Sequence, residues 1–147
     1  MSRCSKLTKK QFKIDYFTAR ATLCYGKFLH VTFTPKGNNV KCPDFLQRLE
    51  STLQTTKGID YGLFSLEKSK QGVYHVHGFI HLINANNKLS KIKKSDLVQL
   101  LIAKSGNPEG WIDYLWKDSP NSYLVYSKTK LKKKTIDKVE ILDYYIV

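Results

Sequence analysis

Two strand-like segments joined by a short polar turn most constrain how this chain can fold. Residues 61–67 and 73–82 are rich in β-branched and aromatic side chains. The residues between them, Lys68-Ser69-Lys70-Gln71-Gly72, are typical of a turn. The pattern predicts an antiparallel hairpin, and a sheet built on it forms the centre of the expected fold.

Further strands and helices are predicted around this hairpin. Strands are expected at residues 28–34, 122–127 and 139–147. Three helices are expected: one opening at Pro43-Asp44, a second capped by Ser95 that carries Leu97, Leu100 and Leu101 and ends near Gly106, and a third from Asn107-Pro108-Glu109 to Ser119-Pro120. The sequence therefore predicts an α+β domain with a central antiparallel β-sheet and flanking helices.

The composition favours a folded domain that binds a polyanion. The chain has 147 residues, the length of one typical domain, and carries 25 Lys+Arg against 12 Asp+Glu, a net charge of +13. Because a cation placed on a phosphate releases condensed counterions, nucleic acid is the expected partner, with an acidic membrane surface as the weaker alternative. No apolar run approaches the ~20 residues of a membrane span, so no membrane insertion is expected.

The distribution of cysteines and lysines narrows the function classes further. Three cysteines without a CxxC pair indicate neither a disulfide framework nor a zinc knuckle, and a reducing compartment is expected. Lysines cluster at residues 3–13, 88–94 and 128–134. Each cluster is interpreted either as solvated surface or as a contact with the nucleic-acid backbone.

A candidate metal site lies in the hairpin. His75 and His77 point to one face of their strand because side chains alternate along it. A turn centred near Gln71 places Glu67 opposite His75, and such a Glu/His/His set can bind a divalent ion with positions left open for substrate. Histidines that bind no metal are the alternative interpretation. His81 shares the face but lies ~13 Å from His77 along the strand, too far to join one ion.

The third helix offers a candidate nucleophile. Tyr114 and Lys117 are three residues apart and face the same way on a helix, which leaves a phenol beside an ammonium group. A tyrosine with a pKa of about 10 is a poor nucleophile at neutral pH, so a neighbouring cation or metal-bound base would help it lose its proton. An amphipathic core helix with a lysine stem lying along it is the simpler alternative.

These segments together resemble the HUH endonuclease superfamily, most closely the replication-initiator (Rep) nicking domains of small circular single-stranded DNA viruses and rolling-circle plasmids. The motifs match in order: FLHVTFTP, LEKSKQGVYHVHGFIHL with its upstream acid, and DYLWKD as a YxxK motif. The resemblance spans roughly residues 28–127 and implies a ferredoxin- or RRM-like antiparallel sheet. Residues 1–27 are predicted to be a basic N-terminal extension of the nicking domain, residues 28–147.

The resemblance implies a role for each candidate residue. Glu67, His75 and His77 are expected to hold a Mg²⁺ or Mn²⁺ ion that polarises the scissile phosphate. Tyr114 is the implied nucleophile, which forms a 5′-phosphotyrosine link and frees a 3′-OH. Lys117 is expected to position the phosphate or to balance charge around the phenolate.

The implied function is sequence-specific, metal-dependent nicking and joining of single-stranded DNA to initiate rolling-circle replication. Expected partners are the single-stranded origin, including a hairpin-loop form, and host or viral replication proteins. The expected location is the interior of the host cell: the nucleus for a virus of eukaryotes, otherwise the cytoplasm. DNA contacts are expected on the sheet face, at His30, Thr32 and Thr34.

Two departures and two alternatives accompany this interpretation. The chain has a longer segment before the first motif than the family usually carries, and it contains no GxxxxGK[ST] phosphate loop of a helicase. An HUH single-tyrosine transposase is the closest alternative, although the acid before His75 and the lysine after Tyr114 favour the replication type. The other alternative is a non-catalytic nucleic-acid-binding module whose basic clusters grip the backbone.

Overall fold

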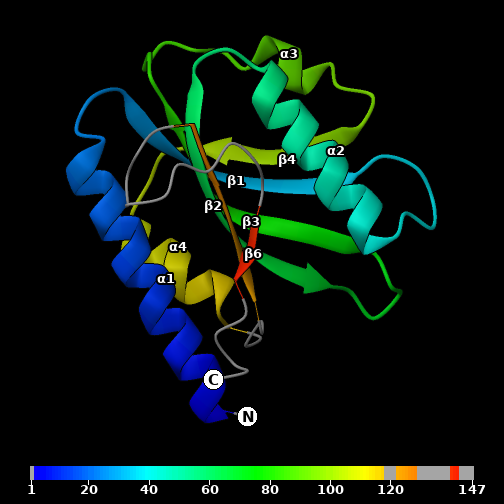
Figure 1. Cartoon of the computed structure of the whole chain (residues 1–147), viewed down its shortest axis with the longest axis horizontal. Coiled ribbons are helices and arrows are strands. Elements are labelled where there is room, and N and C mark those ends of the chain that lie inside the picture. The colour runs from blue at the N-terminus through cyan, green and yellow to red at the C-terminus, as the bar shows by residue number, and fades with distance from the viewer. Residues whose placement is uncertain (1, 118–121, 129–139, 143–147) are drawn as a thin grey trace.

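A six-stranded antiparallel sheet with helices on both faces forms the described part of the chain (Figure 1). The structure, a computed structural model, describes residues 2–117, 122–128 and 140–142. The strands are β1 (Lys27–Pro35), β2 (Ile59–Lys68), β3 (Tyr74–Leu82), β4 (Val98–Lys104), β5 (Tyr123–Ser127) and β6 (Glu140–Leu142). Their order is β4-β1-β3-β2-β5-β6, and each neighbouring pair is antiparallel. The predicted α+β class is confirmed.

The predicted hairpin is confirmed as β2 and β3. Its register pairs Glu67 with His75, as the turn position predicted. The turn is closed by a hydrogen bond from the Ser69 amide to the Val73 carbonyl, 2.8 Å long, and Gly72 adopts a φ of 86°, which a residue without a Cβ takes up without strain. β3 lies between β1 and β2, so the histidine strand is at the centre of the sheet.

Each face of the sheet is covered by its own helices (Figure 1). Helices α2 (Cys42–Thr55) and α3 (Ser90–Lys93) pack on one face, and α1 (Ser2–Thr22) and α4 (Pro108–Leu115) pack on the other. The α2 face buries Phe45, Leu49 and Leu53, which recur every four residues on that helix, against strand residues including Val31, Phe33 and Ile80. The opposite face buries Leu63 and Phe79 under α1 and α4.

Helix α1 belongs to the segment that was predicted to be a basic extension, residues 1–27, and it contributes to the core. Phe12, Tyr16 and Ala19, with Leu23 just beyond the helix end, are all buried against the sheet and α4. Asp15, only 3% exposed, accepts a hydrogen bond of 2.6 Å from the Tyr123 hydroxyl on β5. The helix therefore completes the hydrophobic core beneath one face of the sheet.

The helix predicted after Ser95 is wrong, because Val98–Lys104 forms strand β4 and the helical residues lie earlier, at Ser90–Lys93. The Ser95 hydroxyl oxygen accepts hydrogen bonds from the backbone amides of Leu97 and Val98, which forms a turn into the strand and not a helix cap. The free edge of β1 supplies hydrogen-bonding partners for β4, and this pairing outweighs the local helical spacing of leucines. Along β4 the more buried side chains alternate with exposed ones; they are Val98, Leu100 and Ile102.

The remaining predicted elements are present in the described residues, but the third helix is shorter than predicted. It ends at Leu115, and Trp116 and Lys117 form a turn, so Lys117 does not share the helix with Tyr114 as expected; Ser119 and Pro120 lie outside the described residues. Of the last predicted strand, Glu140–Leu142 forms β6, and residues 143–147 lie outside the described residues. None of the helices in the described part of the chain has the length and apolarity needed to cross a membrane.

Candidate active site

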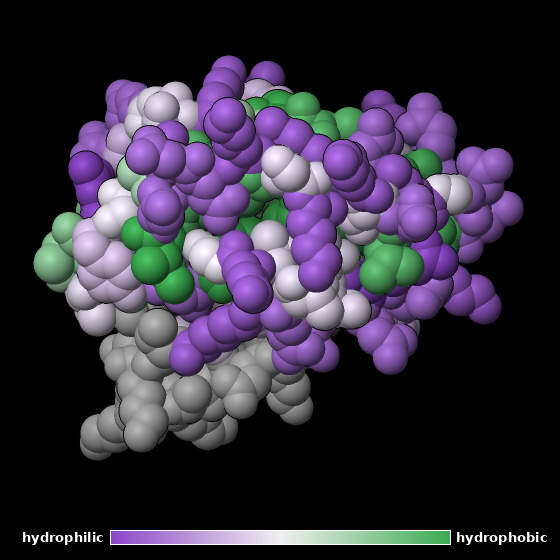
Figure 2. All heavy atoms as spheres, turned by 90° about the horizontal axis from the view of Figure 1, so that it is seen from above, coloured by the Kyte–Doolittle hydropathy of each residue, from purple (hydrophilic) through white to green (hydrophobic). Residues whose placement is uncertain are grey.

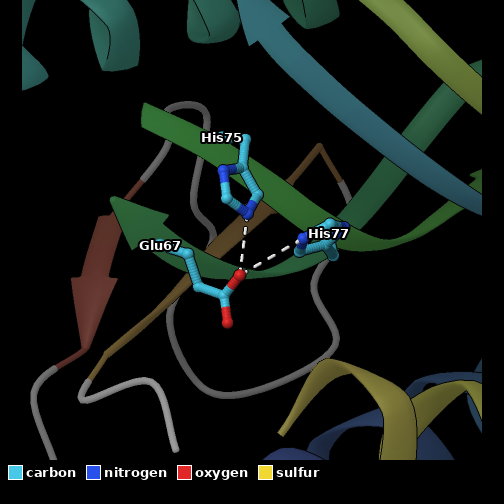
Figure 3. A group of neighbouring side chains, drawn as sticks. All are labelled: Glu67, His75 and His77. Carbon is cyan, nitrogen blue, oxygen red and sulfur yellow. Dashed lines mark hydrogen bonds and ion pairs between the residues drawn. The ribbon is translucent and has the colours of Figure 1, made fainter. Parts of the chain in front are cut away.

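Glu67, His75 and His77 converge on one side of the β2–β3 hairpin (Figure 3). The Glu67 Oε2 atom lies 2.7 Å from His75 Nε2 and 3.4 Å from His77 Nε2. One ligand atom from each residue lies within 4.8 Å of the other two, and all three side chains are half-buried. Among the described residues this is the one such group of potential metal ligands. The structure therefore brings together the three residues that the sequence spacing selected.

The chemistry of this cluster suits a divalent cation. Hydrogen bonds from His75 and then His77 lower the pKa of Glu67 to about 2, against the opposing effect of burial. The carboxylate is therefore anionic at neutral pH, with two imidazole nitrogens beside it. One carboxylate and two imidazoles form a mixed donor set that can hold a divalent metal ion.

Thr32 on β1 supports the cluster from the neighbouring strand. Its hydroxyl oxygen lies 3.0 Å from His77 Nδ1, because the β1–β3 register places the two residues opposite each other. If His77 bound a metal through Nε2, its Nδ1 would carry the proton and would donate to the Thr32 hydroxyl, which would fix the ring. Thr32 is 4% exposed, which leaves little of its side chain for the DNA contact predicted from the sequence.

Tyr114, the predicted nucleophile, lies next to the metal-ligand cluster. Its ring centroid is 6.2 Å from that of His77, with the rings at 82°, and its side chain is 56% exposed. Helix α4 carries it: the Asn107 side chain accepts a hydrogen bond of 3.0 Å from the Glu109 amide at the helix start, and Ile112 anchors the buried face. The phenol is therefore accessible to a large substrate and adjacent to the cluster.

Trp111 holds this arrangement together, and the sequence interpretation missed it. Its ring stacks on Tyr114 at 5.2 Å and 19° and on His30 at 5.1 Å and 9°. Its indole Nε1 donates a 3.0 Å hydrogen bond to the carbonyl of Gly78, the residue after His77. The spacing of Trp111 three residues before Tyr114 was the signal available in the sequence, since residues so spaced are neighbours on a helix.

The other predicted site residues occupy different surroundings. His30 is 6% exposed beneath Trp111, and burial, with the nearby Lys104 charge, lowers its pKa, so a neutral ring faces the indole at neutral pH. Thr34 is half-buried near the end of β1. Its contact with DNA stays a prediction. The exposed Lys117 follows the end of α4, and its backbone amide donates to the Tyr114 carbonyl at 3.2 Å.

The described residues of the lysine clusters lie in different parts of the molecule. Lys9, in the cluster 3–13, forms a 2.8 Å ion pair with Asp113, the residue before Tyr114. This ion pair places Lys9 against α4, the helix that carries the candidate nucleophile. The cluster 88–94 spans α3, which packs on the opposite face of the sheet, and Figure 2 shows hydrophilic side chains over most of that end of the molecule. The cluster 128–134 lies outside the described residues except for Lys128.

Comparison with known proteins yields no relative. No protein-family model matches the chain, and neither the curated proteins nor the solved structures give a match.

Proposed function

We propose that this protein is a metal-dependent endonuclease and strand transferase that acts on single-stranded DNA and initiates rolling-circle replication at an origin. One observation carries the proposal: the Tyr114 ring, more than half exposed, lies 6.2 Å from the ring of His77. His77 belongs to the cluster of two histidines and an anionic glutamate. The order of the three motifs and the net charge of +13 support it.

The reaction is a transesterification at a phosphodiester. Glu67, His75 and His77 would hold a divalent metal ion, which when bound would supply the positive charge that polarises the scissile phosphate. The Tyr114 hydroxyl gives its proton to solvent water, and its oxygen attacks phosphorus. The bond from phosphorus to the 3′ oxygen breaks, so the 5′ phosphate stays on the tyrosine. The 3′ oxygen takes a proton from solvent and leaves as a hydroxyl.

The chain's own residues account for the remaining requirements. Trp111 holds the Tyr114 ring by stacking, which limits the orientations of the phenol relative to the metal ligands. Lys117, an exposed cation three residues after Tyr114, is assigned the role of balancing charge around the phenolate or the phosphate. Because the covalent link keeps the energy of the broken bond, attack by a 3′-OH on the phosphotyrosine rejoins the strand.

The test is formation of a covalent adduct. The protein is mixed with labelled single-stranded oligonucleotides, including hairpin-loop sequences, in Mn²⁺ or EDTA, and the products are resolved on a denaturing gel. We expect an adduct that requires Mn²⁺ and is lost in Tyr114→Phe. Tyr74→Phe is the matched control, since it removes a tyrosine hydroxyl from β3 on the side that packs against the α2 core.

Each contrary outcome has a distinct meaning. An adduct that persists in Tyr114→Phe would assign the nucleophile to another residue. If the wild-type protein binds DNA tightly but forms no adduct with any oligonucleotide, the proposed enzymatic activity is overturned. The protein would then be a nucleic-acid-binding module.

A further inference from the structure

An open cavity of about 450 Å³ lies away from the metal ligands, between the end of α1, the α1–β1 loop and the loop that precedes α4. Its lining includes three aromatic rings, two cationic side chains and a loop glycine: Tyr16, Tyr25, Phe28, Arg20, Lys27 and Gly106. Neither Tyr114 nor any of the three metal ligands lines it.

The most exposed ring of this cavity, Tyr25, is held in place by buried polar groups. Its hydroxyl donates a 2.9 Å hydrogen bond to Asp60 Oδ2, and its backbone carbonyl oxygen lies 2.6 Å from His81 Nε2. His81 Nδ1 also forms a 2.5 Å hydrogen bond with Asp60 Oδ1, and both residues are almost fully buried, at 0% and 3% exposure. Tyr25 itself is 46% exposed, so buried hydrogen bonds fix an aromatic ring that faces solvent.

The loop that carries Tyr25 has little freedom to change. Gly26 adopts a φ of 63°, and a Cβ built on it would lie 1.9 Å from the Leu82 carbonyl oxygen. A glycine is therefore required for the loop to approach β3 so closely. A hydrogen bond of 2.9 Å from the Ile83 amide to the Gly58 carbonyl fixes the chain beyond β3. The cavity wall is therefore preorganised.

A row of rings connects this cavity to the candidate nucleophile. Gly106, on the cavity wall, packs against His30, since a Cβ built on it would lie 3.2 Å from His30 Cε1. His30 stacks on Trp111, and Trp111 stacks on Tyr114. His81, beneath Tyr25, is four residues from His77 on the same strand, which is a span of ~13 Å. A single-stranded DNA whose scissile phosphate lies at Tyr114 therefore reaches the cavity within a few nucleotides.

We propose that this cavity binds one nucleotide of the single-stranded DNA substrate, a few nucleotides from the scissile phosphate. The inference rests on the proposed function. The base stacks on Tyr25, and Arg20 and Lys27 contact the flanking phosphates. Aromatic platforms beside cationic side chains are the means by which proteins bind single strands with little sequence preference. The preorganised ring lowers the entropy cost of this contact.

The experiment compares two oligonucleotide lengths on the full chain in EDTA, where binding is separated from cleavage. Affinity is measured by fluorescence anisotropy for a long single strand and for a short one that covers only the nick site. Tyr25→Leu is expected to weaken binding of the long strand roughly 5- to 150-fold, the range for loss of one base–aromatic stack, and to leave the short strand unchanged. Arg20→Gln is expected to lower the salt dependence of long-strand binding by about one counterion.

Two further variants separate stacking from folding. Tyr25→Phe keeps the ring but loses the bond to Asp60, so it is expected to retain most of the long-strand affinity. Phe17→Leu is the matched control, because Phe17 is an exposed aromatic residue on α1, 39% exposed, that does not line the cavity. A long-strand affinity equal to wild type in Tyr25→Leu, with the fold intact by circular dichroism, overturns the proposal.

The same measurements separate this proposal from the proposed function. If the wild-type protein forms the covalent adduct but Tyr25→Leu binds both oligonucleotides normally, the assignment of the cavity is wrong and the proposed nuclease function is kept. If no adduct forms but Tyr25→Leu loses only binding of the long oligonucleotide, the proposed nuclease function is wrong and the assignment of the cavity is kept. A free deoxynucleoside monophosphate that displaces the long strand at equal concentration would show that the cavity takes a free nucleotide, and would overturn its assignment to the strand.

Discussion

The Nδ1 atom of His77 lies 3.0 Å from the hydroxyl oxygen of Thr32, on the strand next to the metal-ligand hairpin. Groups that hydrogen-bond to metal ligands orient them and commonly contribute 10- to 100-fold in metal affinity. A threonine on β1 therefore belongs to the candidate metal centre as much as the hairpin residues do.

Replacing Thr32 tests this relationship. We expect Thr32→Val to weaken Mn²⁺ binding roughly 10- to 100-fold, because the His77 ring loses the partner that fixes its orientation. Isothermal titration calorimetry measures the change. Thr34→Val is the control, since Thr34 lies two residues along the same face of β1. Equal Mn²⁺ affinity in Thr32→Val and wild type would contradict the role of Thr32.

The charge of Glu67 predicts a pH dependence of the metal-free protein. The pKa of Glu67 is lowered in the folded state to about 2 from an ordinary 4.5, so its contribution to stability is present above pH 4.5 and is lost as the pH falls toward 2. We expect the free energy of unfolding in urea to fall more steeply across this window in wild type than in Glu67→Gln. Parallel curves for the two proteins would argue against the depressed pKa.

Trp111 is expected to act on the rate of adduct formation through Tyr114. In Trp111→Leu the stack on Tyr114 and the hydrogen bond to the Gly78 carbonyl are both lost, so the rate at saturating DNA and Mn²⁺ should fall. Trp111→Phe restores a ring but not the hydrogen bond and should recover part of the rate. Mn²⁺ affinity should stay unchanged in both variants. A loss of Mn²⁺ binding parallel to the loss of rate would show a disturbed fold instead of a misplaced phenol.

The contribution of α1 to the core is tested by two phenylalanines on that helix. Phe12 is fully buried and contacts the rings of Trp116 and Tyr123, whereas Phe17 is 39% exposed. We expect Phe12→Ala to lower the free energy of unfolding by about 3–5 kcal/mol, from lost burial and the cavity left behind. Phe17→Ala should cost far less. Chemical denaturation followed by circular dichroism measures both, and a Phe12→Ala protein as stable as Phe17→Ala would show that α1 is dispensable.

The metal-ligand group was predictable from the sequence because it depends on short-range geometry. Alternation along a strand puts His75 and His77 on one face, and a short turn brings Glu67 opposite His75, so no distant segment enters the inference. The start of α4 was equally predictable, since an asparagine cap, a proline and an acid lie together at its first turn.

Tertiary structure decided what depends on pairing between distant segments. Leu97, Leu100 and Leu101 recur at helical spacing, yet residues 98–104 form a strand because β1 offers an unpaired edge. The contacts of Thr32 with His77 and of His30 with Trp111 follow from strand order and register, which no local pattern specifies. Local sequence pattern is enough to specify the hairpin and its three potential ligands, since their separation is set by the two-residue period of a strand. The folded sheet determined what surrounds them, because packing energy is gained only when residues far apart in the chain meet.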